Sequence, residues 1–314
     1  MQLTDTSTGE IMDTLAEELH AVGGSSSLAL NLIVLATENE RSAIEEATRQ
    51  AAQEHPYRLI MAIPRYPNNE TPRIDAEVAI GESGGAAESI VMYLDGPVVR
   101  NLTSLILPML APDIPVVTWW LVDPVRFHLE EELKIFSDRR ITYSALTPDP
   151  VDSLYRRSIG YKPGDTDICW TRITLWRSLI ASALDGLGPC HVESVRLRAD
   201  RQDPSAQLLA AWIGSRLNLE TEVQDTEVTV NAPNLPAIAG VDLTLNDGQK
   251  IEIDRSPDGE TVLRQAGLAK RTVTLQGRSL GQLVAEELRI LEPDQTYRSV
   301  LDRFELDYQA QNRG

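Results

Sequence analysis

Tryptophan and arginine gather in three short segments of this 314-residue chain, and these residue types are well suited to recognition. The segments hold Trp119, Trp120, Arg139, Arg140, Trp170, Arg172, Trp176 and Arg177. Arginine binds carboxylates or phosphates through paired N–H groups. Arginine and tryptophan are both enriched at the binding hot spots of protein interfaces. Arg172 and Trp176 are four residues apart, a spacing that allows a cation–π contact on one helix face. Tryptophans also fill protein cores, so a binding surface and a structural core both stay open.

Two acidic residues, Asp165 and Asp167, stand directly before the third of these segments. A pair of carboxylates could hold a divalent cation. Acidic residues at the start of a helix also cap its free backbone amides and suit its dipole. The capping interpretation needs no further ligand, and it is the one we expect.

Histidine and cysteine are too scarce to suggest a metal site or a nucleophile. No two of the four histidines stand at ligand spacing, and the two cysteines, Cys169 and Cys190, lie far apart in the sequence. Cys190 and His191 are neighbours, but successive side chains of a strand point to opposite faces, so they would not form a dyad. Each thiol is expected to be buried and inert. No phosphate-binding loop and no Gly-x-Ser-x-Gly motif occurs.

The turn after the first buried strand argues against a nicotinamide cofactor. A dinucleotide-binding fold needs a glycine-rich turn there. The sequence at 37–40 is Thr-Glu-Asn-Glu, which has no glycine and whose carboxylates would repel a pyrophosphate. It is instead typical of a helix-capping box. Gly81, Gly84 and Gly85 lie between two expected strands, where a plain loop is expected and an anion-binding nest is the alternative. The sequence therefore predicts no cofactor.

Residues 1–160 predict an α/β domain, a mixed sheet with flanking helices, because strand and helix patterns alternate along them. Strands are expected at 28–36, 57–63, 73–80, 89–94, 115–121 and 140–143, and helices at 10–21, 37–54, 98–110 and 126–136. Pro64 is expected to end its strand. The segments 147–150 and 160–164 are rich in turn residues, so we place the domain boundary near Gly160.

Residues 161–314 predict an α+β domain with a largely antiparallel sheet. A helix is expected from Asp167 to Gly186, and another at 203–217 with Pro204 in its first turn. Strands are expected at 191–198, 220–230, 237–245, 249–254, 260–266 and 271–275, with hairpin turns at 246–248 and 257–259. Helices at 279–291 and 293–304 follow, and the residues from Gln309 onward are expected to fray.

The composition is that of a folded and strongly acidic chain. The formal net charge is −18 at pH 7. Binding to nucleic acids or to anionic membranes depends on lysine and arginine, so neither partner is expected. The N-terminus has no signal-peptide pattern, and prolines interrupt the most apolar window, 103–122. A cytoplasmic location is expected.

Six motifs occur in order along the chain and together point to one protein family. They are EHPYR at 54–58, GESGGAAE at 81–88, LAPDIPVVTWW at 110–120, RRIT at 139–142, PGDTDICWTR at 163–172, and EELR at 286–289 followed by Pro293, Asp294 and Tyr297. The chain resembles the actinobacterial type of the glucose-6-phosphate dehydrogenase assembly protein (OpcA) family. It departs from the family's usual Pro-Gly at 121–124, and it matches loosely at 220–275.

The resemblance implies a protein with no reaction of its own, an assembly factor and allosteric activator that associates with glucose-6-phosphate dehydrogenase and promotes its active oligomer or raises its activity. We hypothesise that ten residues belong to, or organise, the contact surface: Trp119, Trp120, Arg139, Arg140, Asp165, Asp167, Trp170, Arg172, Trp176 and Arg177. A scaffold that leaves the kinetics of the dehydrogenase unchanged is one alternative. The other is an enzyme or sensor that binds a phosphorylated sugar through the arginines, with an aspartate as base.

Overall fold

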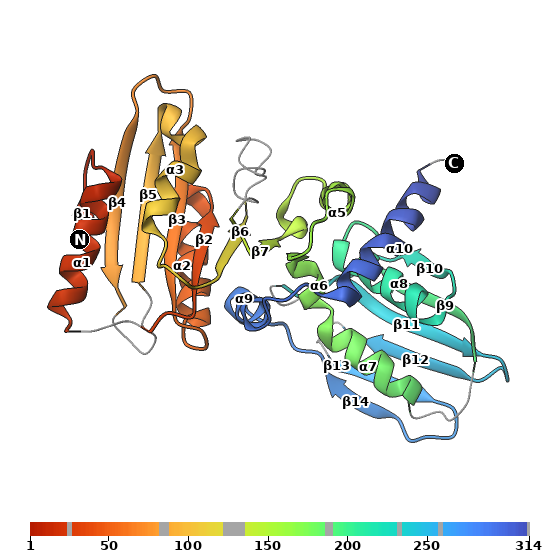
Figure 1. Ribbon diagram of the computed structural model, residues 1–314. Helices are drawn as coiled ribbons and strands as arrows, with labels where there is room; N and C mark the ends of the chain where they lie inside the picture. Colours follow the sequence, from red (N-terminus) through yellow and green to blue (C-terminus); the bar gives the residue numbers. More distant parts are fainter. Residues whose placement is uncertain are drawn as a thin grey trace. The chain divides into compact units, whose positions relative to one another are not determined.

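The computed structural model describes residues 1–23, 27–81, 88–121, 136–185, 191–230, 234–256 and 260–312. The chain forms two compact units whose sequences interleave (Figure 1). The first comprises Met1–Thr142, Pro163–Thr166 and Leu280–Pro293, and the second comprises Tyr143–Lys162, Asp167–Ser279 and Asp294–Gly314. Two short segments from the second half of the sequence therefore belong to the first unit. A boundary near Gly160, between domains at 1–160 and 161–314, stays our proposal for how the sequence divides into domains.

An eight-stranded sheet forms the frame of the first unit. Its strands lie in the order β1-β4-β5-β3-β2-β6-β7-β8. Strands β5, β3, β2, β6 and β7 are parallel, whereas β4 is antiparallel to β5 and to β1. The strands are β1 (Gln2–Leu3), β2 (Leu30–Leu35), β3 (Tyr57–Tyr66), β4 (Arg73–Ile80), β5 (Glu88–Asp95), β6 (Val116–Trp120), β7 (Arg139–Thr142) and β8 (Asp165–Asp167). The predicted mixed sheet is confirmed.

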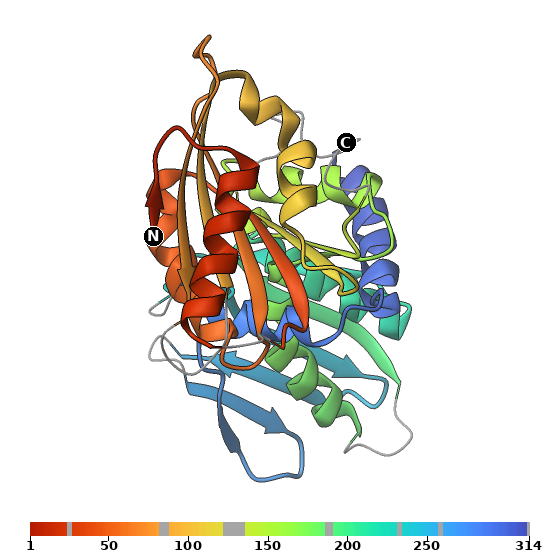
Figure 2. The same cartoon turned by 60° about the vertical axis from the view of Figure 1, so that its left-hand side comes forward.

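Helices cover both faces of this sheet. On one face lie the helix α1 (Thr8–Ala21), the turns η2 (Gly96–Asn101) and η3 (Leu107–Met109), and the short helix α3 (Leu102–Ile106) (Figure 2). Their apolar side chains belong to a core shared with the strands. On the other face, α2 (Arg41–Ala51) packs against α9 (Leu280–Arg289). A Cβ at Gly281 would overlap the Gln50 side chain, so glycine allows the close approach of these two helices.

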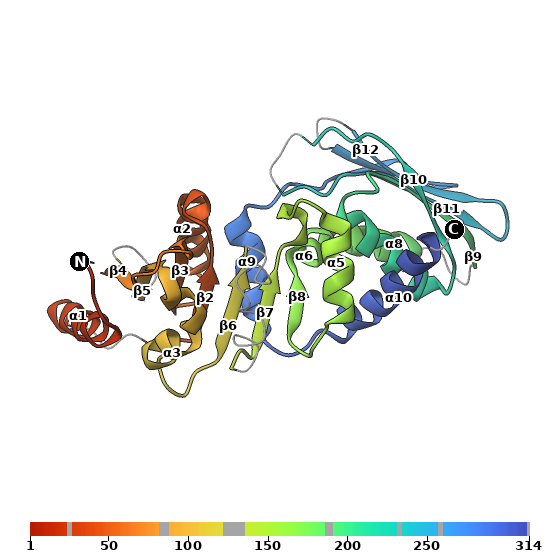
Figure 3. The ribbon, with the colours of Figure 1, turned by 90° about the horizontal axis from the view of Figure 1, so that it is seen from above.

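The second unit is built on a six-stranded sheet in the order β10-β9-β11-β12-β13-β14. Only the β9–β10 pair is parallel, which confirms the largely antiparallel prediction. Its helices gather on one face of that sheet (Figure 3). The strands are β9 (Val192–Ala199), β10 (Thr221–Asp225), β11 (Ile238–Leu245), β12 (Lys250–Arg255), β13 (Glu260–Gln265) and β14 (Arg271–Thr274). The helices are η5 (Ser144–Leu146), α5 (Pro150–Ile159), α6 (Ile168–Arg172), α7 (Thr174–Asp185), α8 (Pro204–Leu217) and α10 (Gln295–Gln311).

Pro64 does not end its strand, contrary to the prediction. Strand β3 continues to Tyr66 and still pairs with β5 there, with a register shift after Pro64. Its pairing with β2 stops at Ala62. Beyond that point β3 has a paired neighbour on one side only, so the missing amide of proline leaves no ladder hydrogen bond unmade.

The helix expected from Asp167 to Gly186 is divided at Ile173 into α6 and α7. The carbonyl oxygen of Thr171 accepts hydrogen bonds from the hydroxyl of Thr174, at 2.9 Å, and from the guanidinium of Arg278. Side chains thus satisfy a carbonyl that a continuous helix would use internally. The sequence pattern did not show this break, because the apolar spacing continues across it.

The C-terminal helix is longer than expected. Helix α10 extends to Gln311 rather than fraying from Gln309. The ring of Tyr308 stacks on that of Tyr155, and the amide of Gln309 donates to the Tyr155 hydroxyl at 3.2 Å. These contacts fasten the last turns of α10 to α5.

Several expectations fall outside the described residues. These are Gly84 and Gly85, most of the helix at 126–136, the turn at 257–259, and Cys190. In the part of the chain that the structure covers, no helix has both the length and the apolar character needed to cross a membrane.

Candidate functional site

The carboxyl end of β2 is the place in the first unit where an open α/β sheet would bind a ligand. Strand β3 lies on one side of β2 and β6 on the other, so the strand order reverses there. The chain then enters the turn η1 (Glu38–Glu40). The carboxylate of Glu40 accepts hydrogen bonds from the amide of Thr37 at 2.9 Å and from its hydroxyl at 2.8 Å. The predicted capping box is confirmed.

This capping box places a fixed negative charge where a dinucleotide fold would receive a pyrophosphate. Phosphates bind there because free helix amides and glycine-rich turns present N–H groups to them. In this chain Glu40 takes the amide of Thr37, and Glu38 adds a second carboxylate to the turn. The electrostatics of the turn therefore oppose phosphate binding.

The neighbouring tryptophans of β6 lie inside the protein. Trp119 is 0% exposed and Trp120 is 2% exposed. Trp120 belongs to the apolar core beneath α1 and α3. Because successive residues of a strand face opposite sides, Trp119 lies on the other face of the sheet. Both side chains act as core residues in this conformation.

Arg139 on β7 holds the returning segment 280–293 in the first unit. It is buried, forms an ion pair with Glu287 on α9, and donates to the carbonyl of Glu292 at 3.3 Å. A buried charge needs such a partner, because water cannot solvate it. The pair therefore fixes α9 against β7.

Arg140, the next residue of β7, holds the second returning segment. It forms an ion pair with Asp165 and donates to the carbonyl of Pro163 at 2.6 Å. Gly164 lies between these two partners with φ +95, and a Cβ there would overlap the carbonyl of Asp138. Only glycine lets the turn approach β7 this closely.

Asp167 caps α6, as the simpler interpretation of the acidic pair predicted. Its carboxylate accepts the amide of Cys169 at 2.9 Å and the amide of Ser144 at 3.0 Å. Asp165 is engaged by Arg140. Among the described residues, no group of three or more candidate ligands is placed to hold a metal ion.

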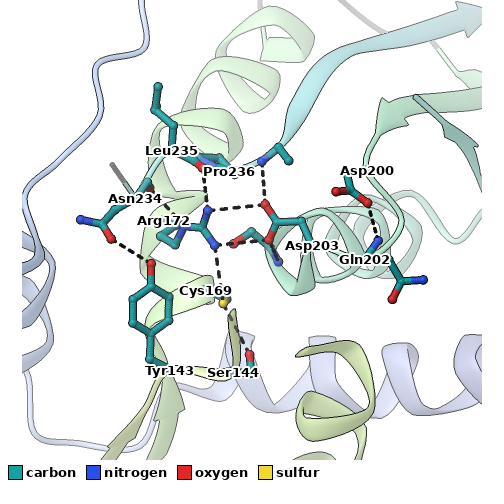
Figure 4. A network of polar contacts seen from close by, with 12 residues as sticks. Tyr143, Ser144, Cys169, Arg172, Asp200, Gln202, Asp203, Asn234, Leu235 and Pro236 are labelled. Carbon is teal, nitrogen blue, oxygen red and sulfur yellow. Dashed lines mark hydrogen bonds and ion pairs between the residues drawn. The ribbon is translucent and has the colours of Figure 1, made fainter. Parts of the chain in front are cut away.

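Arg172 is the centre of a polar network in the second unit (Figure 4). Its guanidinium forms an ion pair with Asp203, with Nη1 3.3 Å from Oδ1. It also donates to the carbonyls of Asn234 at 3.1 Å and Leu235 at 2.6 Å. Tyr143 lies beside it and donates its hydroxyl hydrogen to the side chain of Asn234 at 3.0 Å. Burial alone would lower the pKa of Arg172, but Asp203 raises it, so the guanidinium stays charged.

Asp203 extends this network to two further segments. It is the N-cap of α8 and accepts the amide of Ser205 at 2.8 Å. Its other oxygen accepts the amide of Ala237 at 2.6 Å. The Arg172–Asp203 pair thus joins α6, the loop before α8 and the loop before β11.

Trp170 forms a second network around the start of α10. Its indole N–H donates to Asp294 at 2.8 Å, and Asp294 caps α10 by accepting the amide of Tyr297 at 3.0 Å. The rings of Trp170 and Tyr297 are 5.7 Å apart. The guanidinium of Arg177 lies 3.5 Å from the centre of the Trp170 ring.

The predicted stacking of Arg172 on Trp176 is wrong. Arg172 lies over the ring of Tyr143, at 5.9 Å, and Trp176 is buried on α7. The helix break at Ile173 is the reason, because the four-residue spacing brings side chains together only along a continuous helix.

Most of the ten residues singled out in the sequence are therefore interior. Seven are buried, namely Trp119, Trp120, Arg139, Arg140, Asp167, Trp170 and Trp176, and Asp165 and Arg177 are half-buried. Arg172 is half-buried as a whole residue, but its side chain is buried, at 7% exposed. They divide among separate networks in the two units rather than forming one cluster. Their assignment to partner binding stays a prediction.

Sequence reasoning missed the carboxylates that complete these networks. Glu287, Asp203 and Asp294 are the partners of Arg139, Arg172 and Trp170 respectively. Two of them had a visible signal, since Asp203 and Asp294 each precede a helix in the position of an N-cap. Glu287 lies in the EELR motif at 286–289, but nothing local indicated its partner, because its pairing with β7 depends on the tertiary fold.

The sequence matches two domain families of one protein class over well over half of its length. Residues 48–159 match the N-terminal domain family of the glucose-6-phosphate dehydrogenase subunit, of the OpcA assembly type. Residues 163–301 match the C-terminal domain family of the same subunit. The two matches follow each other along the chain in that order. No curated protein sequence matches significantly.

Several solved structures resemble the chain weakly. KijD10, a 3-ketoreductase from Actinomadura kijaniata in complex with NADP and TDP-benzene, has 11% identity and a TM-score of 0.43 over 90% of this chain and 97% of that one. An oxidoreductase from Sinorhizobium meliloti has 11% identity and a TM-score of 0.44 over 92% and 90%. An inositol dehydrogenase homolog from Azotobacter vinelandii has 10% identity and a TM-score of 0.39 over 91% and 89%. Similarity at this level carries no inference about activity.

Proposed function

The chain belongs to the OpcA-type family of glucose-6-phosphate dehydrogenase assembly proteins, and we propose that it is a non-catalytic factor that binds this dehydrogenase and promotes its active oligomer. The observation that carries the proposal is the match of both family domains along the chain. The dehydrogenase begins the oxidative pentose phosphate pathway, so the proposed effect is a larger supply of NADPH. The cytoplasmic location expected from the sequence belongs to the same proposal.

The turn after β2 supports a role without nicotinamide chemistry. Glu40 occupies the amide and hydroxyl of Thr37 where a dinucleotide fold would bind phosphate. A hydride-transferring enzyme of this architecture needs that position for its cofactor. In the proposed role, the fold therefore serves to position side chains that bind the dehydrogenase.

The buried arginines support an organising role for the predicted residues rather than a phosphate clamp. Arg139, Arg140 and Arg172 each pair with a carboxylate of the protein itself. A carboxylate that already holds the guanidinium competes with an incoming phosphate. We propose that these ion pairs favour binding of the dehydrogenase indirectly, because they fix the segments that carry the surface in contact with it.

Activation requires that the protein bind the active form of the dehydrogenase more tightly than the inactive form. A tenfold shift in population corresponds to about 1.4 kcal/mol of differential binding. A few well-placed interface side chains supply that much.

Complex formation is tested by size-exclusion chromatography of this protein with the dehydrogenase of the same cell. We expect a shared peak of higher mass than either component. Two variants then test the organising role. Arg139→Ala should weaken co-elution, because it releases 280–293 from β7, whereas the matched variant Arg298→Ala removes a partly exposed arginine and should not. Separate elution of the wild-type proteins at micromolar concentrations would contradict the proposal.

A further inference from the structure

The second unit contains an open pocket that none of the networks above fills. Its volume is about 540 Å³, within the ~300–1,000 Å³ range of small-molecule sites. The start of α5, the loop between β9 and α8, the first turn of α8, and the end of α10 form its walls. We propose that this pocket binds a small, neutral, polyhydroxylated molecule of the hexose class.

The walls of the pocket are fixed before any ligand arrives. Arg201 donates through Nε and Nη2 to the carbonyl of Val223, at 3.1 and 2.6 Å, and Gln207 donates to the carbonyl of Arg201 at 2.8 Å. On the opposite side, the Tyr308 hydroxyl donates to Asp152 at 3.2 Å, and its ring stacks on Tyr155 at 4.1 Å. Fixed walls lower the entropy cost of binding a small ligand.

The Arg172–Asp203 pair supports one of these walls. The amide of Asp203 donates to the carbonyl of Asp200 at 3.2 Å, and the amide of Gln202 donates to the Asp200 carboxylate at 2.8 Å (Figure 4). These bonds close a tight turn at 200–203. The turn directs Arg201 and Gln202 to the pocket, while Asp203 stays buried with Arg172.

Three polar side chains of the lining are available to a ligand. The carboxylate of Asp149 does not cap α5, although it stands in the N-cap position. Among the described residues, the side chains of Asp149, Gln202 and Gln311 have no hydrogen-bond or ion-pair partner. Carboxylates accept hydrogen bonds, whereas amides both donate and accept. A ring of hydroxyl groups, each both donor and acceptor, matches such a set.

The charge of the lining selects against phosphorylated ligands. Asp149 and Asp152 are negative, and Arg201 is the one cation among the lining residues that the structure describes, but Asp152 also forms an ion pair with Arg156 at 3.4 Å. The carboxylate that lacks a cationic partner among the described residues is that of Asp149, and its charge repels a phosphate dianion. It leaves the hydrogen bonds of a neutral sugar unaffected, so a neutral sugar should bind more tightly than its phosphate ester.

The test is a titration of the full-length protein with D-glucose and, separately, with glucose 6-phosphate, followed by saturation-transfer NMR. We expect saturable binding of glucose at millimolar concentrations and binding of the phosphate ester at least about tenfold weaker. Gln202→Ala and Asp149→Ala should each weaken glucose binding about 3- to 10-fold, the effect of losing one hydrogen bond. Gln224→Ala, which removes an exposed amide on β10 outside the pocket, should bind as the wild type does.

Three outcomes would overturn this proposal. They are no saturable glucose signal up to about 50 mM, equal binding by the pocket variants and the wild type, and tighter binding of glucose 6-phosphate than of glucose. The titration contains no dehydrogenase, so its failure leaves the proposed assembly function untouched. Failure of this protein to form a complex with the dehydrogenase would likewise not contradict the proposal that the pocket binds a sugar.

Discussion

Arg172 and Asp203 form a buried ion pair across 31 residues of sequence, with Nη1 3.3 Å from Oδ1. Their side chains are 7% and 8% exposed. Asp203 also accepts the amides of Ser205 and Ala237, so one carboxylate connects α6, α8 and the loop before β11. The pair therefore joins three segments of the second unit. We expect its loss to lower the stability of the fold more directly than it affects binding of a partner.

Arg172→Ala should lower the free energy of unfolding by about 3–5 kcal/mol, because it leaves the charge of Asp203 buried without its partner. Urea unfolding followed by circular dichroism measures the change. Arg298→Ala is the matched control, since its pair with Asp302 is accessible to solvent and contributes about 0–1 kcal/mol. An Arg172→Ala protein as stable as the control variant would show that the pair does not hold these three segments together.

Stability should also fall in acid through Asp75. Burial acts to raise the pKa of Asp75, but hydrogen bonds from the Asp5 amide, Arg65 and Arg73 outweigh it and lower the pKa to about 2. The pKa of an aspartate in the unfolded chain is about 3.9, so Asp75 stabilises the folded protein fully at pH values above that. This contribution disappears as the pH falls from about 4 towards 2, the pKa of Asp75 in the folded protein. The loss should amount to about 2 kcal/mol.

Asp75→Asn is the variant that isolates this effect. Its unfolding free energy should lie below that of the wild type at pH 6, and the two values should converge as the pH approaches 2. A constant difference across that range would show that Asp75 stabilises the protein by packing rather than by charge.

The thiol of Cys169 should not react in the native protein. Burial raises its pKa above the ordinary value, and the negative charge of Asp167 adds to the effect. Thiolate is the reactive form, so a raised pKa and a buried sulfur both slow alkylation. In a Cys190→Ser variant, iodoacetamide at pH 8 should label the chain only after denaturation. Fast labelling of the folded variant would contradict this account of Cys169.

Gly240 should tolerate no side chain. A Cβ at this position would overlap the guanidinium of Arg198 and the carbonyl of Ile253, because Arg198 crosses β11 to reach Asp254. Gly240→Ala should therefore destabilise the protein by about 1–3 kcal/mol, as overpacking does. Gly160→Ala is the control, because the nearest atom to its Cβ lies 3.6 Å away. Equal thermal midpoints for the two variants would exclude the overlap.

The fold was largely readable from the sequence because its strands and helices carry clear local patterns. The alternation at 73–80 predicted β4 with its bounds, and the Thr37–Glu40 spacing predicted the capping box. The break at Ile173 and the passage of β3 through Pro64 were not readable. Both depend on tertiary partners, Arg278 in the first case and the end of β2 in the second.

The candidate site was less predictable than the fold. Sequence singled out Arg139, Arg140 and Arg172, and the structure places all three in ion pairs with the protein's own carboxylates. One sequence does not distinguish an arginine that contacts another protein from an arginine that forms an ion pair within its own chain. Burial distinguishes them, and burial follows from the fold as a whole.

Steady-state kinetics of glucose-6-phosphate dehydrogenase, titrated with this protein, test the central claim most directly. NADPH formation is followed at a fixed low concentration of the dehydrogenase, where its active oligomer is scarce. The account predicts a saturable rise in kcat or fall in KM, with a midpoint that matches the concentration at which the two proteins co-elute. Unchanged kinetics at concentrations where the complex forms would contradict activation and leave a scaffold, and unchanged kinetics without a complex would contradict the assembly role itself.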